Sequence, residues 1–94
     1  MNELQRAVQV SVHGTVQGVG YRVWARREAI GLGLRGWVRN ERDGTVTTFF
    51  AGTDAAVSAM IERLWQGPRG ASVTKVEVDK VEPSETPIDF RITA

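Results

Sequence analysis

The chain has 94 residues and a net charge of +1, from 12 basic and 11 acidic side chains. This length fits one domain with a modest core, and the charge is too close to neutral for a protein that wraps nucleic acid. The sequence contains no cysteine, which excludes a disulfide scaffold, a thiol nucleophile, a zinc–thiolate site and an iron–sulfur cluster.

The charge is unevenly distributed between the two halves of the chain. Residues 1–50 carry seven arginines and four acidic residues, a net charge of +3, whereas residues 51–94 carry five basic and seven acidic residues, a net charge of −2. Arginine suits carboxylate and phosphate oxygens, although composition alone favours ordinary scatter over a solvated surface. The sequence has no apolar run of signal-peptide or membrane-span length, so we expect a cytoplasmic protein.

The N-terminal half predicts a strand, a loop and a helix. Valines alternate with polar residues over Val8–His13, as in a strand with one buried face. Three glycines among the seven residues of Gly14–Gly20 predict a loop. From about residue 22 to residue 32 the apolar spacing is helical, and Gly31 and Gly33 are expected to end that helix.

The next segment predicts a hairpin and a second helix. Residues 34–40 and 45–51 are expected to form two strands, joined by a turn at 41–44 that ends in Asp-Gly. The second helix is expected to begin at Thr53 or Asp54, which can cap its first turn. Its apolar stripe stops before Gly67 and Pro68, which end helices.

Two further strands are predicted near the C-terminus. Val76 and Val78 alternate with acidic residues in a fourth strand, and Val81 is out of phase, which indicates a bulge or the end of the strand. Residues 83–87 are expected to form a loop. A short fifth strand is predicted where three apolar residues alternate with Asp89 and Arg91, namely Ile88, Phe90 and Ile92.

This order of elements predicts an α+β fold. Strand, helix, strand, strand, helix and strand, followed by a short strand, gives the ferredoxin-like α/β sandwich. Two helices would cover one face of a mainly antiparallel sheet. We expect residues 1–94 to form a single domain, with residues 1–6 as a loose tail.

The glycine-rich loop before the first helix is a candidate anion site. Successive backbone N–H groups can point inward as a nest, the helix dipole adds partial positive charge, and Arg22 can bind phosphate oxygens with two donors. The alternative is a tight turn in which the glycines only permit the geometry. Val19 excludes a Walker-type loop and Val23 excludes a dinucleotide-binding loop, because each replaces a required glycine or small residue.

A second candidate site residue is Asn40, at the end of a predicted strand. Its side-chain amide both donates and accepts hydrogen bonds, so it can hold a water molecule. The alternative is that the amide only starts the following turn, as asparagine often does.

Two motifs resemble the signatures of the acylphosphatase family. The first is VHGTVQGVGYR at residues 12–22, and the second is GWVRN at residues 36–40, followed by DGTV at residues 43–46. The resemblance covers about residues 7–94 and implies the ferredoxin-like fold that the element order also predicts. It further implies an enzyme that hydrolyses acyl phosphates to a carboxylate and inorganic phosphate, with no metal and no other cofactor.

The resemblance also implies roles for individual residues. Arg22 matches the phosphate-binding arginine of the family, and Asn40 matches the asparagine that orients the attacking water. The backbone amides that match its phosphate-binding loop are those of Thr15, Val16, Gln17, Gly18, Val19, Gly20 and Tyr21. The sequence departs from many members at Gly20, where they carry a second aromatic residue, and at Glu41, where some carry a hydroxyl.

These residues suit the chemistry. A carboxyl group has a pKa of about 4, so a carboxylate leaves as an anion without a general acid. The protein then has to position water and stabilise the charge on the phosphoryl group. A fixed arginine and preorganised N–H donors perform the second task.

Other polar residues have less specific readings. His13 is the single histidine and a possible base, but the alternation turns it off the core face. Glu41 and Asp43 could hold Mg²⁺, yet a solvated hairpin tip explains them better. Thr15 has no base near it in sequence to make it a nucleophile. Three tryptophans are expected to pack in the core or at its rim rather than line a pocket: Trp24, Trp37 and Trp65.

The main rival to an enzyme is a binding module, because this fold hosts many functions. RNA-recognition motifs share the element order, but TVTTFF at residues 45–50 does not match their aromatic signature. Acylphosphatase-like domains also occur inside larger carbamoyl-transfer maturation proteins. We expect a small acyl phosphate as the partner, with no nucleic acid and no membrane, and a monomer.

Overall fold

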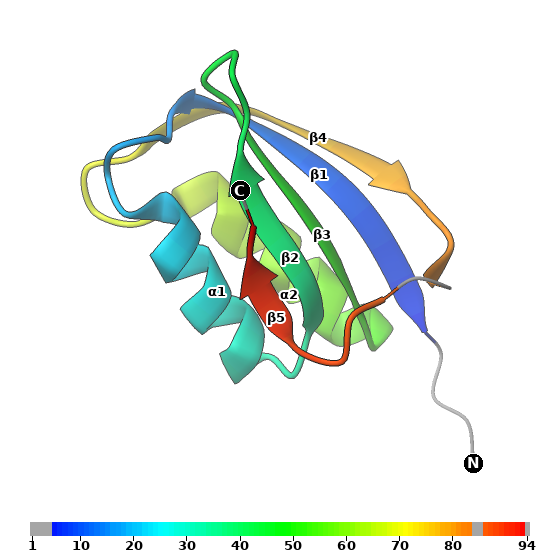
Figure 1. Ribbon diagram of the computed structural model, residues 1–94. Helices are drawn as coiled ribbons and strands as arrows, with labels where there is room; N and C mark the ends of the chain where they lie inside the picture. The colour runs from blue at the N-terminus through cyan, green and yellow to red at the C-terminus, as the bar shows by residue number, and fades with distance from the viewer. Residues whose placement is uncertain (1–4, 84–85, 94) are drawn as a thin grey trace.

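The computed structural model describes residues 5–83 and 86–93. It has two layers, a five-stranded sheet with two helices packed on one of its faces (Figure 1). The elements are β1 (Arg6–Thr15), α1 (Tyr21–Gly31), β2 (Arg35–Asn40), β3 (Val46–Gly52), α2 (Asp54–Gln66), β4 (Ser72–Lys80) and β5 (Phe90–Ile92). This arrangement confirms the predicted ferredoxin-like α/β sandwich.

The strands lie in the order β4-β1-β3-β2-β5. β1 pairs antiparallel with β3 and β4, β2 pairs antiparallel with β3, and β5 runs parallel to β2. Val8, Val10 and Val12 of β1 are buried under the helices, while Ser11 and His13 lie on the opposite, open face. The alternation in the sequence therefore records which face of β1 the helices cover.

The helices bury the stripes that their spacing predicts. In α1 the buried residues are Tyr21, Ala25 and Ala29, and in α2 they are Val57, Met60 and Leu64. Ala25 and Ala29 are one helical turn apart, so their small side chains let α1 lie close to the sheet. These residues and the inward side chains of the strands form one continuous core.

The fifth strand is shorter than predicted. β5 begins at Phe90, whose first partner on β2 is Gly36, and Phe90 is buried. Ile88 precedes this pairing and is 84% exposed, so the prediction that it belongs to the strand is wrong. The alternation of apolar residues begins at Ile88, two residues before Phe90, the first residue of β5 that pairs with β2.

The fourth strand ends as one of the two predicted alternatives. β4 stops at Lys80, and the Val81 N–H donates to the Ala7 carbonyl at 3.1 Å. Val81 packs on the open face of the sheet with Ala7, Phe49 and Ala51. Its changed phase therefore marks the end of β4 and a small apolar cluster opposite the main core.

The N-terminal tail was predicted over residues 1–6. Residues 1–4 lie outside the described part of the chain, and Arg6 is the first residue of β1, opposite Gly52. The Arg6 guanidinium donates to Asp54 at 3.1 Å and to Ser58 at 2.9 Å. Among the described residues, no helix is long and apolar enough to cross a membrane.

Candidate active site

Near its end, β1 contains a glycine that no other residue can replace without strain. The pairing of β1 with β4 shifts register between His13 and Gly14, and Gly14 has φ 123°. A Cβ atom on Gly14 would lie 2.1 Å from the Ser72 carbonyl oxygen. The close approach of β4 therefore requires glycine and fixes where the loop leaves the sheet.

Two valines hold the rest of this loop against the protein. Val16 is fully buried in the main core, and Val19 packs against its edge. Gly18 lies between them with φ 78°, and a Cβ atom there would meet no atom within 4 Å. The loop is anchored on its inner side and open on its outer side.

Within the described part of the chain, no side chain caps the N-terminus of α1. Its N-cap residue is Gly20, in the left-handed conformation at φ 79°, with no side-chain cap and no acidic residue in the first turn. α2 differs, because the Thr53 side chain accepts from the Ala56 N–H and Asp54 lies in its first turn. The first N–H groups of a helix need partners, and at α1 these groups lie at the positive end of the helix dipole, where an anion can bind.

Arg22 is the second residue of α1. Among the described residues it takes part in no ion pair, whereas four other arginines are paired with carboxylates, namely Arg6, Arg39, Arg63 and Arg91. Its guanidinium therefore keeps its donors available for a ligand at the start of the helix.

Asn40 is the last residue of β2 and lies opposite Val46 on β3. It shares a face with the buried Val38, so its side chain points to the helix side of the sheet. Its Oδ1 atom is buried and has no hydrogen-bond partner in the described part of the chain. A buried carbonyl without a partner is costly, so this atom is suited to bind a polar ligand.

The hairpin turn after Asn40 is held by a different side chain. Asp43 Oδ1 accepts from the Thr45 N–H at 3.0 Å and from the Thr45 hydroxyl at 2.6 Å, and these bonds hold the pKa of Asp43 below its usual range. The alternative role for Asn40, starting this turn with its own amide, is therefore filled by Asp43.

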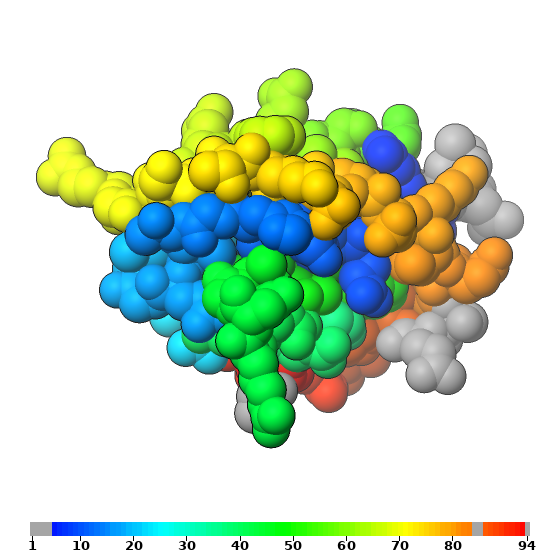
Figure 2. All heavy atoms as spheres, turned by 90° about the horizontal axis from the view of Figure 1, so that it is seen from above, coloured from blue at the N-terminus to red at the C-terminus, as the bar shows by residue number. Residues whose placement is uncertain are grey.

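A hollow of about 100 Å³ brings the two candidate groups together. The loop and the hairpin lie side by side at one end of the sheet (Figures 1 and 2). The residues that line the hollow are Val16, Gly18, Gly20, Tyr21, Arg22, Val23 and Asn40. Of the predicted loop residues, Thr15, Gln17 and Val19 are outside this lining, since Thr15 ends β1 and Val19 packs inward.

Glu41 follows Asn40 but serves the other face of the sheet. Its carboxylate accepts from Arg39 Nε at 2.8 Å, and this bond, with a second from Thr47, lowers the pKa of Glu41. Glu41, Asp43 and Thr47 line a separate, open hollow on that side. The carboxylate is thus neutralised by Arg39 and directed away from Arg22.

The single histidine is also outside the hollow. His13 Nε2 lies 2.8 Å from Glu77 Oε1 on β4, and the second oxygen of Glu77 lies 3.3 Å from Lys75 Nζ. His13 and Lys75 hold the pKa of Glu77 below its usual range. This cluster joins two strands on the open face, as the alternation in β1 predicts.

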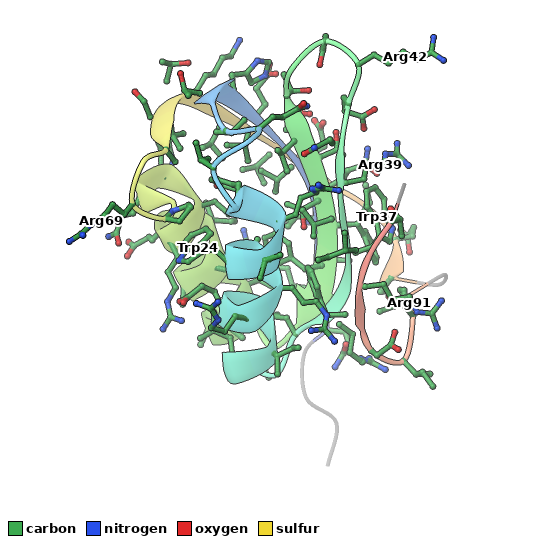
Figure 3. All side chains as sticks on the ribbon, turned by 60° about the vertical axis from the view of Figure 1, so that its left-hand side comes forward. Trp24, Trp37, Arg39, Arg42, Arg69 and Arg91 are labelled. Atoms are coloured by element: carbon green, nitrogen blue, oxygen red, sulfur yellow. The ribbon has the colours of Figure 1, made fainter. Side chains whose placement is uncertain are left out.

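The aromatic residues contribute packing. Trp24 meets the Tyr21 ring edge-on at 5.2 Å, and Trp37 stacks on Phe49 with the Arg39 guanidinium 4.7 Å from its ring (Figure 3). Trp65 differs from the expectation, because it is 49% exposed on α2.

Phe49 and Phe50 are buried, so neither offers the free ring face that RNA-binding sheets use.

Sequence reasoning missed two features of the site. Val23, 57% exposed, forms part of the wall of the hollow; its place beside Arg22 in the first turn was the available signal. The Gln17 side chain turns to the hairpin and donates to two of its carbonyls. No local pattern in the sequence indicates that contact.

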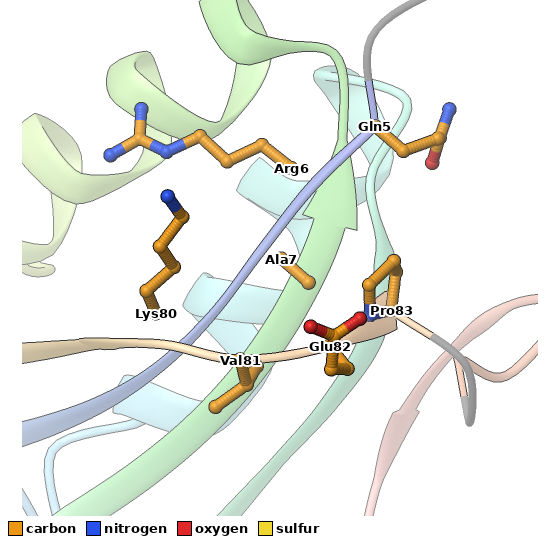
Figure 4. Close-up of a pocket in the computed structure, with 7 residues that line it drawn as sticks. All are labelled: Gln5, Arg6, Ala7, Lys80, Val81, Glu82 and Pro83. Atoms are coloured by element: carbon orange, nitrogen blue, oxygen red, sulfur yellow. The ribbon is translucent and has the colours of Figure 1, made fainter.

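A larger hollow of about 550 Å³ lies at the other end of the sheet (Figure 4). Arg6 and Lys80 point to one side of β1, whereas Ala7 and Val81 lie on the other side. Arg6 is already held by Asp54 and Ser58. The polar groups of this hollow do not converge, so the smaller hollow at Arg22 and Asn40 is the better candidate.

Comparisons with known proteins show the family to which the chain is similar. The acylphosphatase family model matches residues 8–92. An acylphosphatase from Mesorhizobium japonicum is 68% identical over 94 residues, which is the whole of both chains. The acylphosphatase structure from Bacillus subtilis is 31% identical with a TM-score of 0.91, covering 97% of this chain and all of the other. That from Coxiella burnetii is 35% identical with a TM-score of 0.90, covering 95% and 93%.

Proposed function

The chain belongs to the acylphosphatase family, and from this premise we propose that it hydrolyses acyl phosphates to a carboxylate and inorganic phosphate. One observation supports this most directly. Arg22, the uncapped N-terminus of α1 and Asn40 all line the same hollow, and the Oδ1 atom of Asn40 has no hydrogen-bond partner among the described residues. An anion-binding group and a water-binding group thus lie on two sides of one small space.

In the proposed complex the phosphoryl group lies at the N-terminus of α1. Backbone N–H groups between Thr15 and Tyr21 donate to its oxygens, and Arg22 donates two hydrogen bonds from its guanidinium. These donors are fixed before the substrate arrives, so they stabilise the charge of the transition state without reorganisation. The anchoring of Val16 and Val19 in the core supports this preorganisation.

Asn40 positions the attacking water. Its Oδ1 atom accepts a hydrogen bond from the water, whose oxygen attacks phosphorus. The bond between phosphorus and the acyl oxygen breaks, and the carboxylate leaves with the electron pair. Both protons of the water remain with the product phosphate or pass to solvent. Because water attacks phosphorus directly, the reaction needs no covalent intermediate.

The mechanism assigns no role to a metal ion or a cofactor. The carboxylate is a stable anion that needs no protonation, and arginine with backbone donors supplies the positive charge. We also propose that residues 1–94 act as one catalytic domain and as a monomer, since every group in the mechanism comes from one chain. A cytoplasmic location is a further part of the proposal. Light scattering and cell fractionation test these two points.

The activity is tested by phosphate release from benzoyl phosphate without added metal. We expect turnover by the native protein and a fall in kcat/KM of about a hundredfold or more for Arg22→Ala, because a preorganised donor to the transition state is lost. Asn40→Ala should reduce kcat by a similar factor while phosphate still inhibits competitively.

Arg42→Ala is the matched control. Arg42 belongs to the same positively charged half but extends outward from the hairpin tip (Figure 3), so its removal should leave kcat/KM within about twofold at moderate ionic strength. An active Asn40→Ala variant would refute the role in positioning water. Phosphate binding without release from any acyl phosphate would favour a binding module instead.

A further inference from the structure

One side chain of the loop links the two sides of the site. Gln17 Nε2 donates to the Glu41 carbonyl and to the Thr45 carbonyl, both at 2.8 Å. A side-chain amide nitrogen carries two hydrogens, so each carbonyl receives one of them. Gln17 belongs to the loop between β1 and α1, and the two carbonyls belong to the hairpin between β2 and β3.

The two acceptors are the groups that close the hairpin. The Thr45 carbonyl also accepts from the Glu41 N–H at 2.9 Å, and the Glu41 carbonyl also accepts from the Gly44 N–H at 3.3 Å. Each carbonyl oxygen has two lone pairs, and with Gln17 in place both are occupied. Gln17 therefore completes the hydrogen bonding of the turn.

This contact bears directly on Asn40. Asn40 precedes Glu41, and its partner across the strands, Val46, follows Thr45. Beyond these pairs the hairpin tip, residues 42–44, is exposed. The pair Asn40–Val46 is the last of the β2–β3 ladder. The Gln17 bonds therefore hold the residues that directly follow this pair toward the tip of the hairpin.

In the described part of the chain, the sheet joins the two sides only through β3, where Val46 pairs with both Val12 and Asn40. Gln17 and Glu41 are 24 residues apart, and the chain between them runs through α1 and β2. Val16 and Val19 fix the loop to the core independently of the hairpin. The Gln17 side chain adds a direct hydrogen-bonded link between the loop and the hairpin, so it can adjust the distance between the phosphate-binding side and the water-binding side.

We propose that Gln17 is a positioning residue that sets the place of the Asn40-bound water relative to the phosphate-binding loop. This inference rests on the proposed function. It predicts a separation of two effects: phosphate needs only the loop and Arg22, whereas turnover needs both sides in register. Displacement of a reacting group by about 1 Å can reduce a rate by about a hundredfold.

The first test uses Gln17→Met, which keeps the length of the side chain and removes its donors. We expect kcat for benzoyl phosphate to fall about tenfold or more, while the inhibition constant for phosphate changes less than about threefold. Gln66→Met, at the exposed end of α2, is the matched control and should leave both values unchanged. A kcat within twofold of the native value, or an equal loss of phosphate affinity, would overturn the proposal.

A double substitution tests whether Gln17 acts through Asn40. In an Asn40→Ala background, where no water is positioned, Gln17→Met should cause no further loss of kcat. A loss of the same factor in both backgrounds would show that Gln17 acts elsewhere.

Gln17→Glu provides a second variant with a pH signature. Its carboxylate cannot donate to the two carbonyls, whereas its protonated form donates one hydrogen bond. The ratio of its kcat to the native kcat should therefore rise as the pH falls from 8 to 5. A constant ratio would contradict the proposal, and this test remains valid if Gln17→Met fails to fold.

Hydrogen exchange separates this inference from the enzymatic one. In Gln17→Met the Glu41 and Gly44 amides should exchange faster, because the turn has lost its bridge to the loop. Unchanged exchange would refute the bridge even in an active enzyme. Faster exchange together with a native protein that releases no phosphate would leave the bridge in place and refute the proposed reaction.

Discussion

Asn40 and Asp43 are three residues apart, and both types commonly begin turns. Asp43 performs this task through two hydrogen bonds to Thr45, and Asn40 contributes none. The buried Oδ1 atom of Asn40 is consequently the polar group in this region whose presence the hairpin does not explain. These hydrogen bonds give Asp43 the structural role, and the chemical role of Asn40 stays a proposal.

The same comparison gives a prediction for Glu41. A carboxylate beside an anion site raises the cost of binding phosphate, but Arg39 pairs with this one on the open face of the sheet. We therefore expect Glu41→Gln to change KM for benzoyl phosphate by less than about twofold, because a partly exposed, paired charge is largely screened. A fall in KM of fivefold or more would mean that the carboxylate faces the phosphate.

At the scale of elements, the two helices differ in how their first turns are completed. α2 has a threonine cap and an acidic residue, and α1 has neither. Helix stability alone favours the first arrangement. The missing cap and acidic residue thus make the first turn of α1 less stable, and this is the turn where the proposed phosphate would bind.

This difference predicts opposite effects on stability and binding. Val23→Glu puts a negative charge in the first turn of α1, where the dipole should add about 0.3–1 kcal/mol to the free energy of unfolding. The same charge repels phosphate, and its inhibition constant should rise at least about tenfold. Urea unfolding and inhibition assays measure the two quantities.

Ala55→Glu is the matched control, since Ala55 is exposed in the first turn of α2. It should have the same sign of effect on stability and leave phosphate inhibition unchanged. If Val23→Glu binds phosphate as well as the native protein, the N-terminus of α1 is not where phosphate lies.

Most of the elements were predictable because their signals are local. The alternating valines of β1, the helical stripes and the Asp-Gly turn each depend on residues within a few positions of one another. The extent of β5 was not, since it depends on where β2 offers partners: Gly36 faces Phe90, and Ile88 lies before that point. The exposure of Trp65 likewise depends on which side of α2 the sheet covers.

The site divides in the same way. Arg22 and Asn40 were predicted from motifs, and they line one hollow in the structure; their chemical roles stay predictions. The Gln17 bridge joins residues 24 and 28 positions apart. Its donor is one side-chain amide and its acceptors are two backbone carbonyls. Neither the composition nor the periodicity of the sequence indicates such a contact.

Across the whole molecule, the two helices are joined where the site begins. The Tyr21 hydroxyl, at the start of α1, donates to the Leu64 carbonyl in the last turn of α2 at 2.6 Å. A helical carbonyl normally accepts from the N–H four residues later, but that residue is Pro68, which has no N–H. Tyr21 supplies the hydrogen bond that the end of α2 lacks, and both residues are fully buried.

Removing this hydroxyl should destabilise the whole fold. Tyr21→Phe keeps the ring and leaves the Leu64 carbonyl buried without its donor, so we expect the free energy of unfolding to fall by about 1–3 kcal/mol and the melting temperature by at least about 4 °C. Urea and thermal unfolding measure this change. A loss below about 0.5 kcal/mol would mean that water reaches the carbonyl.

Alkaline pH gives an independent check with a defined sign. Burial raises the pKa of Tyr21 well above its ordinary value of 10.0. Above about pH 10 the phenol ionises in the unfolded chain but stays protonated in the folded protein, so this group lowers the stability of the native protein as the pH rises. Phenylalanine does not titrate. The stability difference between native protein and Tyr21→Phe should therefore be constant below about pH 9 and shrink above pH 10, and a difference that stays constant to pH 11 would refute the burial of the hydroxyl.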